Sequence, residues 1–167
     1  HENGCDYWLL TKEVGNNTWR VFPVTNLGVG NIPVTSNQGP VTPATWGTLN
    51  ATPNSEIVAL SNRDAGVHIY DFDKLTGQLA YRYGEDIGNH YSLEFSPNGE
   101  LIYYTCLTNP SIYQLDLNSA NQVDFIASKI VVGSTANTAH QYKLGALQLG
   151  PDGKIYLALI STTYLGV

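Results

Sequence analysis

The sequence predicts an all-β fold, a β-propeller built of four-stranded antiparallel blades, of which these residues form a partial set. Two observations lead to this prediction. Three stretches with nearly the same turn and flanking strands recur along the chain, and the composition is typical of short strands joined by tight turns. The 167 residues include 16 glycines and 11 tyrosines, whereas charged residues account for only 13%.

The repeated stretch reads as a β-hairpin whose turn contains proline, then asparagine or aspartate, and usually glycine. Proline sets φ at the second turn position, and glycine accepts the left-handed conformation that closes such a turn. β-branched and aromatic residues flank each turn, as strands require. We therefore expect equivalent hairpins over residues 49–60, 93–104 and 147–158. The turns are Thr52-Pro53-Asn54-Ser55, which lacks the glycine, Ser96-Pro97-Asn98-Gly99 and Gly150-Pro151-Asp152-Gly153.

Two further strands complete the repeated unit. The third is expected at residues 69–73 in one copy and at 112–116 in the next, and the fourth at 78–83 and 128–132. The turn prolines are 44 and then 54 residues apart, near the roughly 40–50 residues of a propeller blade. The longer spacing predicts an extended surface loop over residues 118–143.

Counting these units divides the chain into two complete blades and parts of two more, approximately 1–45, 46–90, 91–143 and 144–167. The first part supplies second and third strands without a first strand, and the third strand of the last part is expected near Gly166. Because propellers close with about 4–8 blades, residues 1–167 are interpreted as a single segment of a larger propeller that is not stable alone. Its open ends are expected to expose Trp8, Leu9 and Leu10 on one side and Tyr156, Leu157 and Leu159 on the other.

The charge pattern argues against two classes of partner. The formal charge is −6, and the eight lysines and arginines are scattered, so we expect no nucleic-acid binding. No run approaches the roughly 18 apolar residues of a membrane span, so we expect no membrane insertion. The sequence also lacks the glycine-rich phosphate loop, the zinc-protease motif and the nucleophile elbow of common enzymes. We therefore expect no cofactor, and a non-catalytic role is favoured over an enzymatic one.

The candidate binding residues are polar side chains at one position of the first strand in three successive blades: Asn50, Glu94 and Gln148. The first strand of a propeller blade is innermost, so these side chains are expected to surround the central channel. They would contact a ligand there or hydrogen-bond neighbouring blades to each other. The second alternative is favoured because buried polar groups need partners.

Metal sites are not expected. Asp71, Asp73 and Thr76 resemble the start of a calcium loop, but the twelfth position is Arg82, so a capped turn is favoured. The histidines lie far apart in sequence, whereas zinc needs three or four converging ligands. These histidines are His1, His68, His90 and His140.

Trp8, Trp19 and Trp46 have two alternative roles. Exposed tryptophans would form a surface on which sugars stack. Wedging between adjacent sheets is the favoured role, because aromatic side chains contribute large apolar areas to cores.

Five segments resemble the WD-like propeller of large secreted proteins of the Bacteroidota: "HENGCDYWLL", "VHIYDFDKLTGQL", "LEFSPNGELIYYT", "SIYQLDL" and "GALQLGPDGKIYLA". The resemblance implies a secreted or cell-surface location at the outer-membrane exterior, with export by type IX secretion as in gliding-motility-associated multidomain proteins. It implies a non-catalytic interaction or scaffold module whose partner is a protein, a cell-surface glycan or the secretion machinery.

Two alternatives to that role stay open. One is a carbohydrate-active enzyme that pairs Glu94 with a second acid about 5–9.5 Å away. The other is a carbohydrate-binding propeller, which exposed tryptophans would distinguish.

Overall fold

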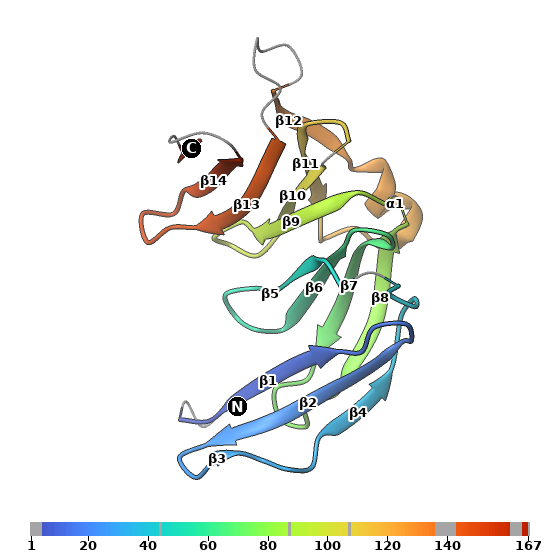
Figure 1. Cartoon of the computed structure of the whole chain (residues 1–167), viewed down its shortest axis with the longest axis vertical. Helices are drawn as coiled ribbons and strands as arrows, with labels where there is room; N and C mark the ends of the chain where they lie inside the picture. Colours follow the sequence, from blue (N-terminus) through green and yellow to red (C-terminus); the bar gives the residue numbers. More distant parts are fainter. Residues whose placement is uncertain are drawn as a thin grey trace.

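The computed structural model describes residues 5–43, 45–86, 88–106, 108–135, 143–160 and 165–166. Within these ranges the chain forms four antiparallel sheets that follow one another along the sequence (Figure 1). The all-β class and the four-stranded antiparallel unit predicted from the sequence are confirmed. No helix in the described ranges is long and apolar enough to cross a membrane.

The first sheet contains β1 (Tyr7–Lys12), β2 (Thr18–Thr25), β3 (Gly28–Val29) and β4 (Val34–Asn37). In this sheet β2 pairs with β1 on one side and with both β3 and β4 on the other. The second sheet contains β5 (Gly47–Ala51), β6 (Ile57–Asn62), β7 (Gly66–Phe72) and β8 (Leu79–Glu85), paired in that order.

The third sheet contains β9 (His90–Phe95), β10 (Leu101–Cys106), β11 (Ser111–Asp116) and β12 (Ile130–Ser134), and helix α1 (Gln122–Ala127) connects its last two strands. The fourth sheet contains β13 (Lys143–Leu149), β14 (Ile155–Ile160) and β15 (Leu165–Gly166). Because β15 pairs with β14, the strand predicted near Gly166 is confirmed.

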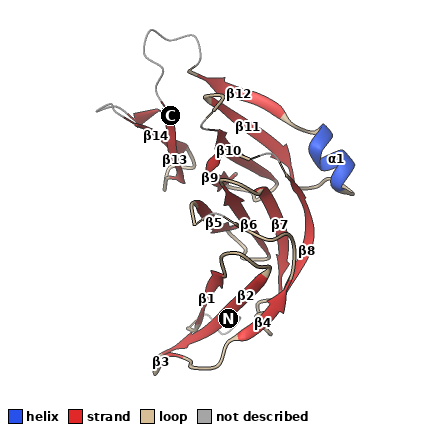
Figure 2. Ribbon diagram, turned by 45° about the vertical axis from the view of Figure 1, so that its right-hand side comes forward, coloured by secondary structure: helices blue, strands red, loops and turns tan. Residues whose placement is uncertain are grey.

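The sheets stack face to face along an arc (Figure 2). Strands β5, β9 and β13 lie side by side on the inner side of this arc, whereas β8, β12 and α1 lie on the outer side (Figure 1). The first strands of the second, third and fourth sheets therefore have the inner position expected of propeller blades.

The three predicted hairpins are confirmed as β5–β6, β9–β10 and β13–β14. Gly99 and Gly153 have φ angles of 72° and 77°, in the left-handed region. Ser55 occupies the equivalent position with φ of 57°. The turn therefore forms without its glycine, although a side chain in this region is strained.

Three apolar clusters fill the spaces between successive sheets. Because side chains alternate between the two faces of a strand, β6 contributes Val58 and Leu60 to the cluster shared with the first sheet and Ala59 to the cluster shared with the third. Leu147 and Leu157 of the fourth sheet pack with Tyr103 of the third. Each described sheet is thus held to the next by buried apolar area.

This alternation corrects the prediction for the open ends. Trp8 and Leu10 pack against the second sheet, and Leu157 and Leu159 pack against the third. Neighbouring residues of one strand cannot share a face. The six residues predicted to be exposed together are therefore divided between a packed face and an open face.

The loop predicted over residues 118–143 is partly wrong, because it contains α1. Asn121 caps this helix by accepting hydrogen bonds from the backbone N–H groups of Val123 and Asp124. Phe125 is fully buried, and its ring centre lies 4.5 Å from that of Tyr83 in β8. The insertion thus packs an aromatic side chain onto the outer strand of the preceding sheet.

The predicted equivalence of the third strands is shifted by two residues. Phe72 donates its backbone N–H to Glu56 and Leu117 donates to Glu100 at the same point of the repeat. Tyr70 is therefore equivalent to Leu115 instead of Tyr113. A shift of two residues leaves each side chain on its original face, so the apolar pattern alone could not detect it.

Candidate functional site

The three candidate residues lie at one register position of the inner strands. In the antiparallel pairing, Asn50 of β5 lies opposite Ala59, Glu94 of β9 opposite Tyr103, and Gln148 of β13 opposite Tyr156. The inner strands are adjacent, so this position repeats from sheet to sheet. The three side chains differ in the hydrogen-bond partners that each one has among the described residues.

Glu94 joins three adjacent inner strands. Its Oε1 accepts hydrogen bonds from the Asn50 side chain at 2.7 Å and from the Phe95 backbone N–H at 2.8 Å. Its Oε2 accepts a bond from the backbone N–H of Leu149 in β13 at 2.9 Å. Glu94 is only 8% exposed, so these donors replace the water that a carboxylate would otherwise bind. The structure brings Asn50 and Glu94 together, and they hydrogen-bond neighbouring sheets to each other.

Gln148 is separate from this pair. Its side chain is exposed and lines a hollow of about 370 Å³ on the fourth sheet, together with Ala146, Pro151 and Tyr156. The candidate residues therefore do not form one continuous polar ring over the described residues. Two of them connect sheets, and the third faces an open surface.

Other polar groups also connect the inner strands. The Ser92 hydroxyl accepts a hydrogen bond from the backbone N–H of Leu147 at 2.9 Å. Thr48 donates its hydroxyl to the carbonyl of Tyr91 at 3.2 Å, and Thr105, on the second strand β10, donates to the carbonyl of Gly145 in β13 at 3.2 Å. Serine and threonine side chains, which no sequence motif indicated, thus also hydrogen-bond neighbouring sheets to each other near the inner side of the arc.

A buried charged cluster lies between the second and third sheets. The carboxylate of Glu85, which is 1% exposed, accepts a hydrogen bond from the Tyr104 hydroxyl at 2.6 Å and contacts the Lys129 ammonium. Burial, together with the bond to Glu85, raises the pKa of Tyr104. Glu85 is the last residue of β8, and its partners Tyr104 and Lys129 are distant in the sequence, so no local pattern indicates this cluster.

Two buried histidines lie near this cluster on different sheets. The His90 ring centre is 4.4 Å from that of Tyr104, and the residue is 2% exposed. Burial lowers the pKa of His90 to about 4, and it also lowers the pKa of His68. Both imidazoles are therefore neutral near pH 7, and they pack within the core.

The described residues contain no group of three or more histidine, cysteine, aspartate or glutamate side chains positioned to hold a metal ion. His1 and His140 lie outside the described residues. Asp73 accepts hydrogen bonds from the Leu75 backbone and the Thr76 hydroxyl. Asp71 instead contacts Arg82 across the β7–β8 pair. The interpretation of this segment as a capped turn is therefore confirmed.

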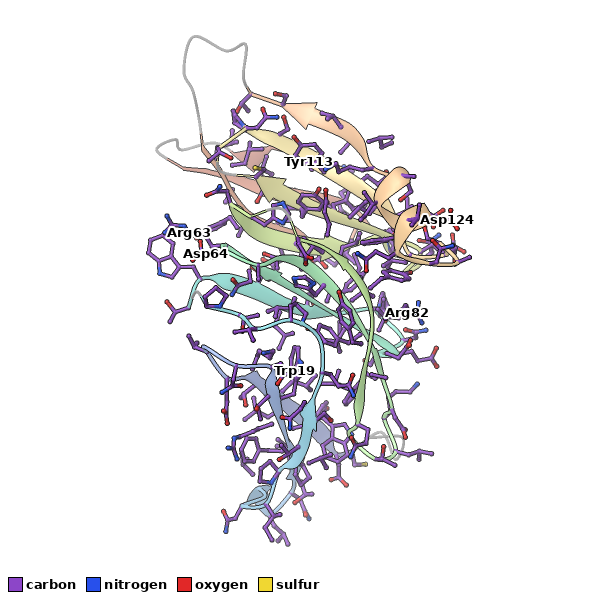
Figure 3. The ribbon with its side chains drawn as sticks, turned by 90° about the vertical axis from the view of Figure 1, so that its right-hand side faces the viewer. Trp19, Arg63, Asp64, Arg82, Tyr113 and Asp124 are labelled. Carbon is purple, nitrogen blue, oxygen red and sulfur yellow. The ribbon has the colours of Figure 1, made fainter. Side chains whose placement is uncertain are left out.

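The tryptophans divide between the two predicted roles. Trp19 is fully buried, and the half-buried Trp8 packs between the first and second sheets and donates its indole N–H to the carbonyl of Lys74 at 2.9 Å. Trp46 is 58% exposed, and the guanidinium of Arg63 lies 5.0 Å from its ring centre. Arg63 and the adjacent Asp64 project at one edge of the molecule (Figure 3). The favoured wedge role is wrong for Trp46, because this side chain just before β5 is mostly exposed and lines an open hollow between the first and second sheets.

The fold is that of a β-propeller, and solved structures of that class are similar to the chain. Dihydro-heme d1 dehydrogenase NirN matches with a TM-score of 0.63 at 18% identity, over 95% of this chain and 31% of its own. The β-propeller domain of Cps50 (Swd1) from Myceliophteria thermophila matches with a TM-score of 0.58 at 10% identity, over 95% of this chain and 50% of its own. The periplasmic gluconolactonase PpgL of Pseudomonas aeruginosa matches with a TM-score of 0.58 at 15% identity, over 94% and 47%.

The chain thus spans between about a third and a half of the length of these three solved chains. At such low identity the likeness shows the fold and does not extend to activity. No protein-family model matches the sequence. No curated protein matches it either.

Proposed function

We propose that the chain is part of a non-catalytic interaction or scaffold module. The observation that supports this role is the state of Glu94, whose two carboxylate oxygens accept hydrogen bonds from Asn50, Phe95 and Leu149. A general acid or nucleophile in the channel would need a carboxylate that is free to exchange a proton or to attack. Glu94 instead serves to connect the sheets, and the loops at both ends of the strands are available for contacts.

The location is proposed from the sequence resemblance to propellers of secreted Bacteroidota proteins. The module would work at the cell surface after type IX secretion, with a protein or a surface glycan as its partner. Protease treatment of intact cells tests the location. Cleavage in wild-type cells, together with protection in a strain that lacks the secretion system, is the expected result; protection in both strains would contradict it.

The enzymatic alternative is tested by turnover. NirN and PpgL are named as a dehydrogenase and a gluconolactonase, so sugar lactones and polysaccharides are suitable substrates for a survey of the intact polypeptide that its gene encodes. We expect no turnover above that of a Glu94→Gln variant. Activity that this substitution removes while the variant stays folded by circular dichroism would overturn the non-catalytic role.

A second candidate, carbohydrate binding, is favoured by the exposure of Trp46. An indole with a solvent-facing ring and a neighbouring guanidinium can stack on a sugar face and donate hydrogen bonds to its hydroxyls. A Trp46→Ala variant is expected to weaken binding to a responding glycan on an array at least tenfold. Leu75→Ala, a substitution of a residue that is 66% exposed on a turn between other strands, is the matched control. Equal binding by both variants would exclude the Trp46 surface.

A further inference from the structure

We propose that the hollow beside Trp46 binds an acidic sugar, with the sugar ring stacked on the indole and the sugar carboxylate on the ammonium of Lys12. The proposal rests on the carbohydrate-binding candidate and deepens it, because it adds the charge of the ligand and the residue that selects this charge. The hollow has a volume of about 160 Å³ and is lined by residues of the first and second sheets. Its polar and aromatic lining consists of Lys12, Thr42, Thr45, Trp46, Thr48 and Asn62, with Thr11 beside them.

Lys12 differs from the other basic side chains that the structure describes. Each of the others forms an ion pair with a carboxylate, whereas Lys12 forms none with any described carboxylate. The paired residues are Arg20, Arg63, Lys74, Arg82, Lys129 and Lys154. The positive charge of Lys12 is therefore available to a ligand in the hollow.

Neutral acceptors hold the Lys12 ammonium in place. It donates hydrogen bonds to the carbonyl of Asn16 at 2.6 Å and to the hydroxyl of Thr42 at 3.3 Å. A lysine ammonium has three N–H donors, and the third has no acceptor among the described residues. Burial lowers the pKa of Lys12, and the charge of Glu13 opposes this shift only in part. A ligand carboxylate would supply both the third acceptor and the missing countercharge.

No acidic residue lines the hollow. The acid next to Lys12 in the sequence is Glu13, and its carboxylate contacts Arg20 and accepts a hydrogen bond from Asn16 at 2.8 Å. The chain as a whole has a formal charge of −6. The lining of this hollow is thus locally positive in a protein that is otherwise acidic, and this contrast favours an anionic ligand there.

Trp46 supplies the surface on which a sugar ring can stack. The indole is 58% exposed. The Trp46 carbonyl accepts a hydrogen bond from the Arg63 backbone at 3.0 Å, which fixes the position of the residue before β5. Stacking on an aromatic ring covers the apolar face of a sugar, and its hydroxyls then need polar partners. Thr45 and Asn62 line the same hollow and offer such groups.

Size and charge favour one ring with a carboxylate. The hollow is smaller than the roughly 300–1,000 Å³ of pockets that enclose drug-sized ligands, so we expect a single sugar ring to enter while the rest of a glycan stays outside. A phosphate carries up to two charges and is commonly held by arginine forks or by several backbone N–H groups. The lining offers one ammonium, which matches the single charge of a uronic acid.

The first experiment compares acidic and neutral forms of the same sugar. The intact polypeptide is screened on an array of acidic and neutral glycans, and calorimetry then measures binding of oligoglucuronate, oligogalacturonate and their methyl esters. The ester keeps the ring and removes the charge. At least one acid is expected to bind tenfold or more tightly than its ester, with an advantage that shrinks as salt is raised.

The outcomes separate this proposal from the candidate on which it rests. Equal affinity for acids and esters would overturn the role of charge and leave carbohydrate binding in place. Binding to neutral glycans alone would do the same. A lack of binding to every glycan on the array would contradict both proposals.

The second experiment assigns the charge to Lys12. Lys12→Met keeps the apolar stem and removes the ammonium, so affinity for the acid is expected to fall at least tenfold while affinity for the ester stays unchanged. The unchanged ester binding shows that the variant is folded. Lys154→Met, at a side chain that is 62% exposed in the fourth sheet, is the control and is expected to bind like wild type. A Lys12→Met variant that still prefers the acid overturns the proposal.

Discussion

Glu94 illustrates how one buried carboxylate connects three strands. Its donors come from β5, β9 and β13, and each is a group that would be costly to bury without an acceptor. The carboxylate offers only acceptors and the three groups offer only donors, so every contact is favourable. An amide at this position could not accept from all of them.

We predict that Glu94→Gln lowers the free energy of unfolding by about 1–3 kcal/mol. An amide has one acceptor oxygen, so its NH₂ group would face a donor that loses its partner. Chemical denaturation of the intact polypeptide measures the change. Glu56→Gln, at a side chain that is 59% exposed and paired with Lys74, is the control and should have a much smaller effect. Equal losses for the two variants would show that Glu94 does not join the sheets.

His90 makes stability depend on pH. Its pKa is about 4 in the folded protein because of burial, against about 6.5 in an unfolded chain. Between these values the unfolded chain binds the extra proton, so stability is full above pH 6.5 and declines as the pH falls toward 4. The decline attributable to His90 approaches about 1.4 kcal/mol per pH unit in that interval.

Denaturation at pH 7, 6, 5 and 4.5 tests this expectation with wild type and His90→Gln. The variant should lose a smaller part of its stability over this range, whatever its stability at pH 7. A residual slope is expected because burial also lowers the pKa of His68. Parallel curves for the two proteins would exclude His90 as a source of the pH dependence.

At the scale of the element, the hairpin turn that lacks glycine contains stored strain. Ser55 has a φ of 57°, whereas its counterparts Gly99 and Gly153 adopt similar angles without a side chain. The Thr52 hydroxyl contacts Asn54 at 2.7 Å, as Ser96 contacts Asn98 at 2.6 Å. The same side-chain contacts thus form both turns, and the difference between them is confined to one residue.

We predict that Ser55→Gly stabilises the protein by about 0.5–1 kcal/mol, since relief of the left-handed strain exceeds the added entropy of the unfolded chain. The reciprocal change, Gly99→Ser, should destabilise it by a similar amount. A new Cβ at Gly99 would lie 3.4 Å from Thr52 Cγ2, which is a tolerable contact, so the effect would come from the backbone. Thermal denaturation measures the change in melting temperature that each of the two substitutions causes. Shifts of the same sign would contradict the strain argument.

At the scale of the whole molecule, the arc leaves one face of its first sheet without a described neighbour. Tyr7 and Leu9 are 68% and 46% exposed on that face, while Trp8 and Leu10 between them pack inward. Each interior sheet of the arc buries both faces against neighbours, as in other repeat architectures. Stability is therefore shared along the array.

We predict that residues 1–167, expressed alone, lack a single cooperative thermal transition and bind an apolar dye. The exposed sheet face is the physical reason, because such patches favour association. Calorimetry measures the unfolding transition of residues 1–167, and fluorescence measures how much dye they bind. Where the gene encodes a longer polypeptide, the same two measurements on it provide the comparison. If the fragment binds no dye and unfolds in one sharp transition, exposure of the open sheet face costs little free energy of unfolding.

The sequence by itself determined the repeat, the three hairpins and the propeller class. Turn chemistry and the period-two alternation are local, and Pro53, Pro97 and Pro151 mark the same point of each unit. The candidate residues Asn50, Glu94 and Gln148 also follow from that local register. Only the tertiary structure decided which of them meet, because hydrogen bonds between sheets depend on the distances between strands far apart in sequence. The same holds for the Glu85–Lys129 contact, for the burial of Phe125 in α1 and for the exposure of Trp46, since burial is a property of the packed array.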